Sequence, residues 1–553
     1  MIAKIEIDGK EYEVKRGDNL LSVAQKLGVF IPHLCYFSKL SPSGKCGICA
    51  VEINDKAIEL SCLLPVENGL RVATHNEKIQ NFRKKNINRI LRMHNIECCK
   101  CSKNGFCSLQ GATASIYRKE KNIDNFKGNT NKALPIKIND DIIYDKSKCI
   151  FCMRCVKFAN EICGKNIESP EDLRNMKNND FIGNLVDLCP TAALNQSNIN
   201  EQNSLLDSEY IETFSISNVF MQPITAFSSN NQIIKVSATE HFIDDKTRFL
   251  HKDLNNLSYK FDNEKYKEII EKLAEKISEN NDKKCLFIIG DNIDIESFFY
   301  IKYLQKHKNN VTISIDDFNI PRLFLENSLK NIDKLILADA VIIVNPLSIN
   351  LVQALLTTIK NLKDKIIINI DELENFAENN KQNSKLFSYK RPALVLFSNF
   401  FESANVPENI ISDFKKKYEE AYLTTIETFV IPPSLSLILS NNLPEFSPLN
   451  CLNEDWNFIC QIGDISKNIE LKHDLYVQNA AFSENIPAPH FLQDSCLYLN
   501  IFGKTINTKT LISTELKPNR EFLFDLMSKI FKDEFSDINT KIQNEIKERF
   551  LNT

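Results

Sequence analysis

The chain has 553 residues, which is too long for one hydrophobic core and predicts roughly three or four domains. Its 68 basic and 72 acidic side chains leave a formal charge of −4, so the charge gives no indication of nucleic acid as a partner. Apolar runs such as Ala340–Val344 are far shorter than the roughly 18 residues of a membrane span. The first residues already alternate like a strand, so we expect no secretory or transit peptide before them.

The cysteines are concentrated at the start of the chain. Of the 17 cysteines, 13 lie at or before Cys189, and many are separated by only two residues. In a secreted domain this density would indicate disulfides. In a long chain without a signal sequence, spacing typical of metal ligands favours thiolates bound to metal in a reducing compartment.

The first 75 residues predict a small sheet with one helix. We expect a helix at Asn19–Leu27 with Asp18 as its cap. The order of strands and helix resembles the β-grasp ferredoxin architecture. The expected strands are Ile2–Asp8, Tyr12–Lys15, Ala50–Ile53, Ala57–Cys62 and Leu70–Thr74.

This region contains four cysteines with the spacing C-x10-C-x2-C-x12-C. Gly44 and Gly47 lie in the loop that carries the second and third of them, where glycine lets the backbone approach an inorganic cluster. The spacing favours a 2Fe–2S cluster and leaves zinc as the alternative. The four candidate ligands are Cys35, Cys46, Cys49 and Cys62.

A helix is predicted next, over Glu77–His94. We expect its basic side chains to form a solvated face, with contact to an acidic partner or to nearby anionic clusters as a second possibility. The expected buried stripe is Ile79, Phe82, Ile87, Ile90 and Leu91. The expected solvated face is Lys78, Arg83, Lys84, Lys85, Arg89 and Arg92.

The helix leads into the pattern H-x3-C-x2-C-x5-C, formed by His94, Cys98, Cys101 and Cys107. One imidazole and three thiolates suit zinc as well as a 4Fe–4S cluster. The position between two other cluster motifs favours 4Fe–4S, because an isolated electron carrier needs a neighbour. A neutral imidazole ligand would raise the reduction potential. Cys99 falls outside the spacing and is expected to be a spare thiol.

The third motif reads C-x2-C-x2-C, followed much later by a Cys-Pro pair. The close spacing lets one loop direct three sulfurs into one small volume, and Pro190 holds the fourth cysteine in a turn. Structural zinc usually pairs two C-x2-C hooks, so the spacing favours a 4Fe–4S cluster. The candidate ligands are Cys149, Cys152, Cys155 and Cys189.

The rest of the chain alternates strands and helices after a polar segment, Asn195–Ser208, that reads as a linker. This alternation predicts parallel sheets, and no strand-to-helix turn carries a G-x-G-x-x-G or P-loop motif. The end, Asn519–Phe550, is expected to be helical with Phe522, Leu523, Leu526, Met527 and Ile530 packed. The expected strands are Lys284–Ile289, Val311–Ile315, Ala338–Val344, Lys365–Ile370, Pro392–Phe397 and Trp456–Ile462, with helices at Ile293–His307 and Leu351–Ile359.

Together the three motifs resemble the large iron–sulfur subunit of respiratory complex I, the proton-pumping NADH:quinone oxidoreductase. They occur in that family's order, and the flanking segments Gly105–Gln110 and Gly183–Leu194 are similar to the family's. The stretch between Cys155 and Cys189 is shorter than usual in the family. The resemblance implies one 2Fe–2S cluster on the first ligand set and one 4Fe–4S cluster on each of the others. It implies no molybdopterin and no flavin on this chain.

The resemblance also implies an α+β and α/β multidomain fold. Residues 1–76 would form the 2Fe–2S domain, 77–118 the 4Fe–4S domain with the mixed histidine and cysteine ligands, and 119–200 a ferredoxin-like 4Fe–4S domain. Residues 201–553 loosely resemble a molybdopterin-oxidoreductase-like α/β domain that has lost its cofactor and serves as a scaffold. The best matches there are Asp244–Phe249 and Tyr476–Glu484.

The implied function is electron transfer within an oxidoreductase complex, without a complete active site or catalytic residues on this chain. Electrons would arrive from NADH through a flavin-bearing partner and leave through a two-cluster ferredoxin-like subunit towards quinone. The chain would lie in the peripheral arm, on the matrix side of a mitochondrial inner membrane or the cytoplasmic face of a bacterial one. It would meet the membrane only through the complex.

Relatives with a similar front end fit the sequence less well. Iron-only hydrogenases continue the third motif with x3-Cys-Pro, where this chain has Ala159. Molybdenum formate dehydrogenases, and complex I subunits with an extra cluster, need further cysteine motifs after residue 200. The later cysteines are scattered and form none: Cys285, Cys451, Cys460 and Cys496. A diaphorase-type subunit of a hydrogenase or formate dehydrogenase, and a zinc-stapled structural protein, stay as alternatives.

Overall fold

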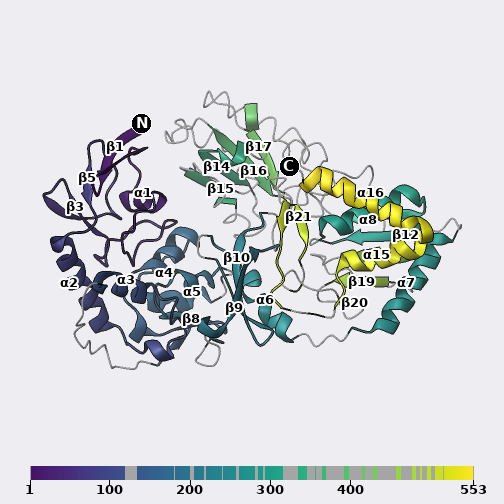
Figure 1. The fold of residues 1–553 in the computed structure, drawn as a ribbon, viewed down its shortest axis with the longest axis horizontal. Helices are drawn as coiled ribbons and strands as arrows, with labels where there is room; N and C mark the ends of the chain where they lie inside the picture. Colours follow the sequence, from purple (N-terminus) through teal and green to yellow (C-terminus); the bar gives the residue numbers. More distant parts are fainter. Residues whose placement is uncertain are drawn as a thin grey trace. The chain divides into compact units, whose positions relative to one another are not determined.

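The computed structural model describes residues 2–118, 134–199 except 178 and 180, 205–344 with gaps (the widest 316–333), short segments between 355 and 499, and 505–551 except 513 and 515. The chain divides into two units, which are described separately. The first unit holds Met1–Glu209, Ile234–Thr239 and Asp244–Leu250, and the second holds the remainder. Figure 1 traces both units from purple to yellow along the sequence.

The first unit opens with the predicted sheet and helix. Strands β1 (Ile2–Ile7), β2 (Lys10–Lys15), β3 (Ala50–Ile53), β4 (Ala57–Leu60) and β5 (Arg71–Ala73) form a sheet of order β2-β1-β5-β3-β4, in which β1 and β5 are parallel. Helix α1 (Leu20–Lys26) contributes Leu20, Leu21, Val23 and Ala24 to the core. The predicted cap was wrong by one residue, because the Asn19 side chain accepts the Ser22 N–H at 3.1 Å.

Helix α2 (Glu77–Met93) follows, with His94 as its C-cap. The predicted stripe is buried at Ile79, Ile87, Ile90 and Leu91. Two positions were assigned wrongly: Phe82 is 38% exposed, and Arg83 is buried. The Arg83 guanidinium donates to the Ala50 carbonyl at 2.6 Å, so a contact with β3 overrides the helical pattern.

Short elements make up the rest of the first unit. The three-stranded antiparallel sheet β6-β7-β8 lies among helices and turns, and its last strand occupies the start of the predicted linker. The linker prediction was therefore wrong at Asn195 and Gln196, while residues 200–204 lie outside the described part. The elements are η1 (Cys98–Lys100), α3 (Ser108–Tyr117), β6 (Ile136–Lys137), β7 (Ile142–Tyr144), η2 (Lys146–Lys148), α4 (Arg154–Lys157), η3 (Phe158–Ile162), η4 (Pro170–Met176), α5 (Asn184–Leu188), β8 (Leu194–Gln196) and η5 (Leu205–Asp207).

A buried ionic group ties α5 to later residues of the same unit. The Asp187 carboxylate lies 2.6 Å from the Arg248 guanidinium and 3.2 Å from the Lys235 ammonium, and all three side chains are less than a tenth exposed. Arg248 also donates to the Asn184 side chain at 2.9 Å. Burial raises the pKa of Asp187, but the two cations outweigh it and bring that pKa down to about 2. The carboxylate is therefore ionised at neutral pH.

The second unit contains parallel strands, as predicted. One sheet has the order β13-β12-β18-β19-β20 and another has the order β15-β14-β16-β17, and neighbouring strands run parallel in both. The predicted strands at 284–289, 311–315, 392–397 and 456–462 are confirmed, whereas most of the predicted helix Leu351–Ile359 lies outside the described residues. The strands are β12 (Lys284–Ile289), β13 (Val311–Ile315), β14 (Ala340–Val344), β15 (Asp364–Ile368), β16 (Pro392–Phe397), β17 (Glu427–Ile431), β18 (Trp456–Ile462), β19 (Tyr476–Ala480) and β20 (Ile486–Pro487).

Helices at the end of the chain pack within this second unit. The predicted helical end is observed but is divided at Lys532, where φ is +48°. All five residues predicted to pack are buried, and Tyr266 of α7 meets Phe522 and donates to Asp525 at 2.8 Å. The remaining elements are β9 (Glu209–Phe214), β10 (Pro223–Ser229), β11 (Gln232–Ser237), α6 (Asp245–Asn256), α7 (Asn263–Ser278), α8 (Ile295–His307), β21 (Leu497–Leu499), β22 (Thr505–Asn507), α15 (Asn519–Phe531), η8 (Lys532–Glu534), α16 (Phe535–Ile546) and η9 (Lys547–Leu551).

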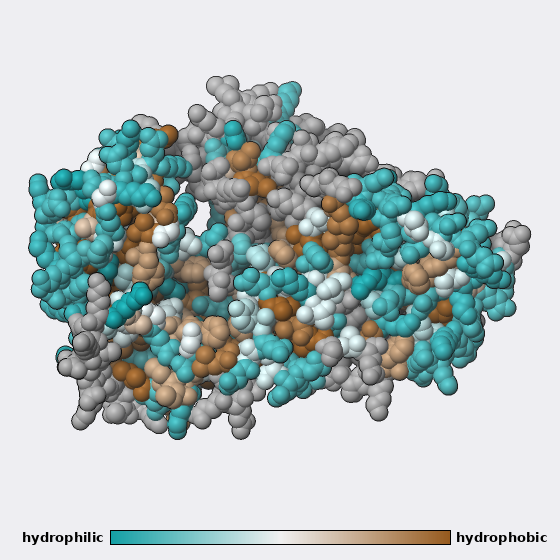
Figure 2. Space-filling view, viewed as in Figure 1, coloured by the Kyte–Doolittle hydropathy of each residue, from teal (hydrophilic) through white to brown (hydrophobic). Residues whose placement is uncertain are grey.

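The surface is mainly polar where it can be followed. Figure 2 shows hydrophilic side chains over most of the coloured face, with scattered apolar patches between them. Within the described part of the chain, no helix combines the length and apolar character needed to cross a membrane.

The buried ionic group gives a test of the fold. We expect Asp187→Asn to lower the local free energy of opening by about 3–5 kcal/mol, because it leaves two buried cations without their anion. Hydrogen exchange at residues 184–188 measures this. The matched control is Glu67→Gln, which removes an exposed carboxylate 2.6 Å from Arg16 and should cost less than about 1 kcal/mol. Equal effects of the two changes would contradict the expectation.

Candidate metal centres

The first predicted ligand set comes together in the β1–β5 domain. Its four thiols are buried, between 0% and 5% exposed, and they interact with one another. Hydrogen bonds from the Cys46 and Cys62 thiols lower the pKa of Cys35, and one from Cys62 lowers the pKa of Cys49. The same bonds raise the pKa of Cys46 and of Cys62. Four sulfurs from distant parts of the domain thus share one buried volume.

The loop before β3 places two of these cysteines. Gly47 has a φ of +71°, and a Cβ there would lie 2.7 Å from the Asn86 side chain. Both the left-handed backbone and the close approach of α2 therefore require glycine at this position. The loop is also attached to α4, because the Lys157 ammonium donates to the Ser41 and Pro42 carbonyls at 2.6 and 2.9 Å.

The second set lies where α2 ends. The His94 Nδ1 lies 3.0 Å from the Lys148 carbonyl and donates to it as the neutral ring's N–H, which leaves Nε2 without a proton. Burial lowers the pKa of His94, so the ring is neutral. A neutral imidazole whose outer nitrogen is held by a carbonyl has the chemistry of a metal ligand. Cys98, Cys101 and Cys107 follow it, and the Cys101 thiolate contributes to raising the pKa of both Cys98 and Cys107, after burial.

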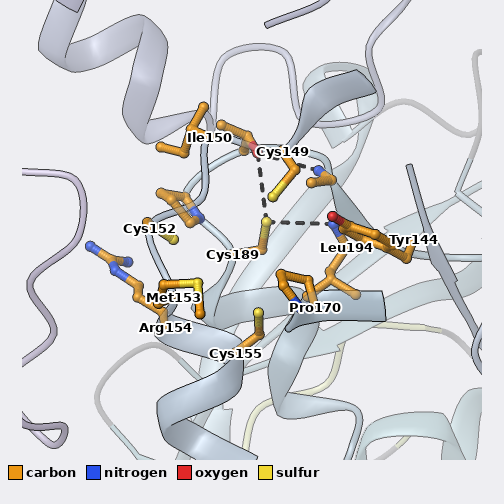
Figure 3. A pocket seen from close by; sticks show the side chains of 13 residues that line it. Tyr144, Cys149, Ile150, Cys152, Met153, Arg154, Cys155, Pro170, Cys189 and Leu194 are labelled. Atoms are coloured by element: carbon orange, nitrogen blue, oxygen red, sulfur yellow. Dashed lines mark hydrogen bonds between the residues drawn. The ribbon is translucent and has the colours of Figure 1, made fainter. Parts of the chain in front are cut away.

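The third set surrounds a small cavity that is partly open to solvent. All four thiols line it, and Figure 3 shows Cys149, Cys152, Cys155 and Cys189 around this space. Phe151 and Met153 adopt left-handed conformations, with φ of +51° and +64°, and so fold the C-x2-C-x2-C loop tightly. A cavity bordered by four sulfurs fits the donor set of a cubane cluster.

Backbone donors already serve two of these sulfurs. The Phe151 N–H donates to the Cys149 sulfur and the Leu194 N–H donates to the Cys189 sulfur, each at 3.4 Å. Such N–H groups can donate to sulfurs that hold a cluster. Another candidate donor is the Tyr144 hydroxyl, which lines the cavity and makes no hydrogen bond of normal length within the described residues.

Direct contacts join the three sites within the first unit. The Ser43 hydroxyl donates to the Cys152 carbonyl at 3.5 Å, linking the first and third sites. The Cys107 sulfur donates to the Pro190 carbonyl at 3.6 Å, linking the second and third. The Lys103 ammonium also donates to the Cys189 carbonyl. The third site therefore contacts both of the others, although its motif comes last in the sequence.

Six cysteines were predicted not to be ligands. Four are buried, as expected of small apolar residues: Cys163, Cys285, Cys460 and Cys496. Cys99 is exposed, and Cys451 lies outside the described residues. Among the described residues, no group of three or more His, Cys, Asp or Glu side chains is arranged to hold a single metal ion. The assignment of the twelve ligands stays a prediction, which the proximities above support.

Comparisons with known proteins agree with the iron–sulfur interpretation. Residues 3–77 match the family model described as a 2Fe-2S iron-sulfur cluster binding domain. Residues 140–195 match the model described as the ferredoxin-like domain of NADH-quinone oxidoreductase subunit 3. The predicted iron–sulfur character of these two regions is confirmed, whereas the molybdopterin-oxidoreductase-like domain stays a prediction.

Relatives that match more of the chain point to one family. The chain is 25% identical to an NADH-quinone oxidoreductase subunit of Rickettsia felis, over 57% of this chain and 50% of that protein. It is 25% identical to the NADH-ubiquinone oxidoreductase 75 kDa subunit of Reclinomonas americana, over 55% of this chain and 47% of that protein. The chain is similar to the large iron–sulfur subunits of complex I. It spans about half the length of the curated relatives it matches.

Two further matches cover less of the chain. The NADPH-Fe(3+) oxidoreductase subunit alpha of Geobacter sulfurreducens is 33% identical over 35% of this chain and 24% of that protein. A solved structure of an NAD+-reducing NiFe-hydrogenase in its H2-reduced state is 25% identical and has a TM-score of 0.32. It covers 36% of this chain and 88% of the hydrogenase chain.

The glycine loop of the first site gives a second test. We expect Gly47→Ala to disturb the loop, because alanine is strained at this φ by about 1–2 kcal/mol and its Cβ would also meet Asn86. Gly28→Ala is the control, since Gly28 has a φ of +73° but nothing within 4 Å of a Cβ. Two measurements distinguish the two variants: hydrogen exchange at residues 43–52, and the amount of iron that stays with the protein after gel filtration. A milder effect at Gly47 than at Gly28 would show that the close approach is unimportant.

Proposed function

We propose that this chain is an electron-transfer subunit in the peripheral arm of complex I, carrying electrons from the NADH and flavin module towards quinone. The single observation that carries the proposal is that the three ligand sets are adjacent, joined by contacts such as the Ser43 hydroxyl to the Cys152 carbonyl and the Ser108 N–H to the Pro190 carbonyl. One-electron carriers exchange electrons only with near neighbours, so a set of adjacent sites has the arrangement that a relay needs. The family relatives support the same conclusion.

The proposed cofactors are one 2Fe–2S cluster on the first set and one 4Fe–4S cluster on each of the second and third sets. When bound, these groups supply the one-electron chemistry, since no catalytic residues are proposed on this chain. The protein holds the thiolates, buries all four of the first set and three of the third, and donates hydrogen bonds to sulfurs of the third. Donors such as the Phe151 and Leu194 N–H groups stabilise the more negative, reduced state and so raise the reduction potential.

His94 gives the second site a different electrostatic character. Its Nδ1–H is held by the Lys148 carbonyl, so Nε2 is the nitrogen available to a cluster. Because a neutral ring replaces a thiolate, the second cluster would carry one negative charge less than the third. We therefore propose that the second cluster has the higher potential of the two four-iron clusters.

The second unit is proposed to be a scaffold related to a molybdopterin oxidoreductase without its cofactor. Its parallel sheets support an α/β assignment. The proposed domains are 1–76, 77–118, 119–200 and 201–553. The proposed partners are the flavin- and NADH-binding subunit and the two-cluster ferredoxin-like subunit, on the matrix side of a mitochondrial inner membrane or the cytoplasmic face of a bacterial one.

Metal analysis tests the proposal most directly. We expect about ten iron atoms per chain, two plus four plus four for these cluster types, and no stoichiometric zinc. Electron paramagnetic resonance of the reduced protein should resolve one two-iron and two four-iron signals. Zinc in place of iron would establish the zinc-stapled alternative. Copurification with a nickel or molybdenum subunit, instead of membrane subunits, would favour the diaphorase alternative.

Paired cysteine variants test the ligand assignment. We expect Cys98→Ser and Cys189→Ser each to remove one four-iron signal and about four irons, because each would remove one ligand of a 4Fe–4S cluster. The matched controls are the neighbouring Cys99→Ser and the equally buried Cys163→Ser, which should keep all signals. Loss of a signal in a control, or its survival in a ligand variant, would reassign that ligand.

A further inference from the structure

Arg154 lies between two of the proposed cluster sites and touches both. It begins α4, between Cys152 and Cys155 in the sequence, and its side chain is buried. Its guanidinium donates to the Tyr36 carbonyl at 2.6 Å through Nη2 and to the Leu188 carbonyl at 3.2 Å through Nη1. Tyr36 directly follows a ligand of the first site. Leu188 directly precedes a ligand of the third.

Within the described residues, no carboxylate compensates this buried charge. Arg154 forms no ion pair with any Asp or Glu of that part of the chain, and its Nε has no hydrogen-bond partner there. Its other close contact is the Phe37 ring, whose centroid lies 5.9 Å from the guanidinium carbon. A buried cation without an anion is costly, so an anionic partner is expected at this position.

The surrounding thiols identify that partner. Arg154 lines the third site's cavity together with Cys152 and Cys189, and its Nη2 donates to the carbonyl of the residue that follows Cys35 of the first site. Figure 3 shows Arg154 beside Cys152 at the edge of the third site's cavity. Other nearby cations are placed differently. Lys157 is only partly buried and bonds to loop carbonyls, and Lys103 bonds to the Val186 and Cys189 carbonyls.

We infer that Arg154 is the shared counter-charge of the first and third clusters, raising the reduction potential of both and holding the two sites together. The inference rests on the proposed function, since it requires clusters at these sites. Each cluster gains one negative charge on reduction, and a fixed cation nearby stabilises the reduced state more than the oxidised state. Because the cation acts on both sites, one side chain shifts the reduction potentials of the first and third clusters in the same direction. Arg154 is a positioning residue and takes no part in bond making.

The first experiment removes the charge. The experiment uses the full chain with its clusters assembled. We expect Arg154→Gln to lower the equilibrium constant for one-electron reduction of each of the two clusters by about tenfold or more, at an effective dielectric constant near 20. For a one-electron couple, tenfold corresponds to about 59 mV. Redox titration followed by electron paramagnetic resonance reads the two-iron and four-iron signals separately. Arg154→Lys keeps the positive charge, so both reduction potentials should stay close to those of the unmodified chain.

A control removes an equal charge from the same helix. Lys157→Gln takes away a partly exposed cation that is bonded to the loop of the first site, and water screens its field more than it screens the buried Arg154, so both potentials should move by less. A shift of only one signal in Arg154→Gln, or shifts no larger than those of Lys157→Gln, would overturn the inference. If the unmodified chain itself contains no clusters, the proposed function fails first, and that result is distinguishable by iron content.

A second pair of variants keeps Arg154 in place. Phe37→Glu would put a carboxylate next to the guanidinium, while Phe37→Gln has the same shape without the charge. We expect Phe37→Glu to lower both potentials relative to Phe37→Gln, because the carboxylate neutralises the counter-charge. This comparison tests whether charge at this position acts on both clusters, even if Arg154→Gln assembles poorly. Equal potentials in the two Phe37 variants would overturn the inference.

Discussion

The first unit depends on one physical requirement, which is the burial of many thiolates within a small volume. Burial alone raises the pKa of cysteines such as Cys155, because a thiolate loses its hydration. The unit offsets this cost with donors directed at the sulfurs and with cations held nearby. The Phe151 and Leu194 N–H groups act on individual sulfurs, and Arg154 acts between sites. Sites built in this way can gain and lose single charges without exposing them to water.

The same contacts that compensate charge also fix the order of the sites. The loop of the first site is bound to α4 through Lys157, and the end of α2 is bound to the third motif through His94. Each of these contacts joins a ligand, or a residue close to one, to the backbone of the adjacent site. The third site is consequently in contact with both of the others.

The buried ionic group at Asp187 extends this arrangement to the end of the first unit. Asp187 lies two residues before the proposed ligand Cys189. Its partners Lys235 and Arg248 lie in two later segments, residues 234–239 and 244–250, that also belong to the first unit. These contacts support α5, next to the third site.

Sequence alone determined the features that depend on spacing and periodicity. The three ligand patterns, the strands at 284–289 and 456–462, and the apolar face of α15 could be read directly, because their ligand spacing or hydrophobic pattern is local. Tertiary structure decided which side chains meet across long separations. Arg83 turned inward to a carbonyl of β3, and Arg154 bonds to a carbonyl 118 residues away. No local pattern predicts such contacts, since they exist only once separate segments have packed together.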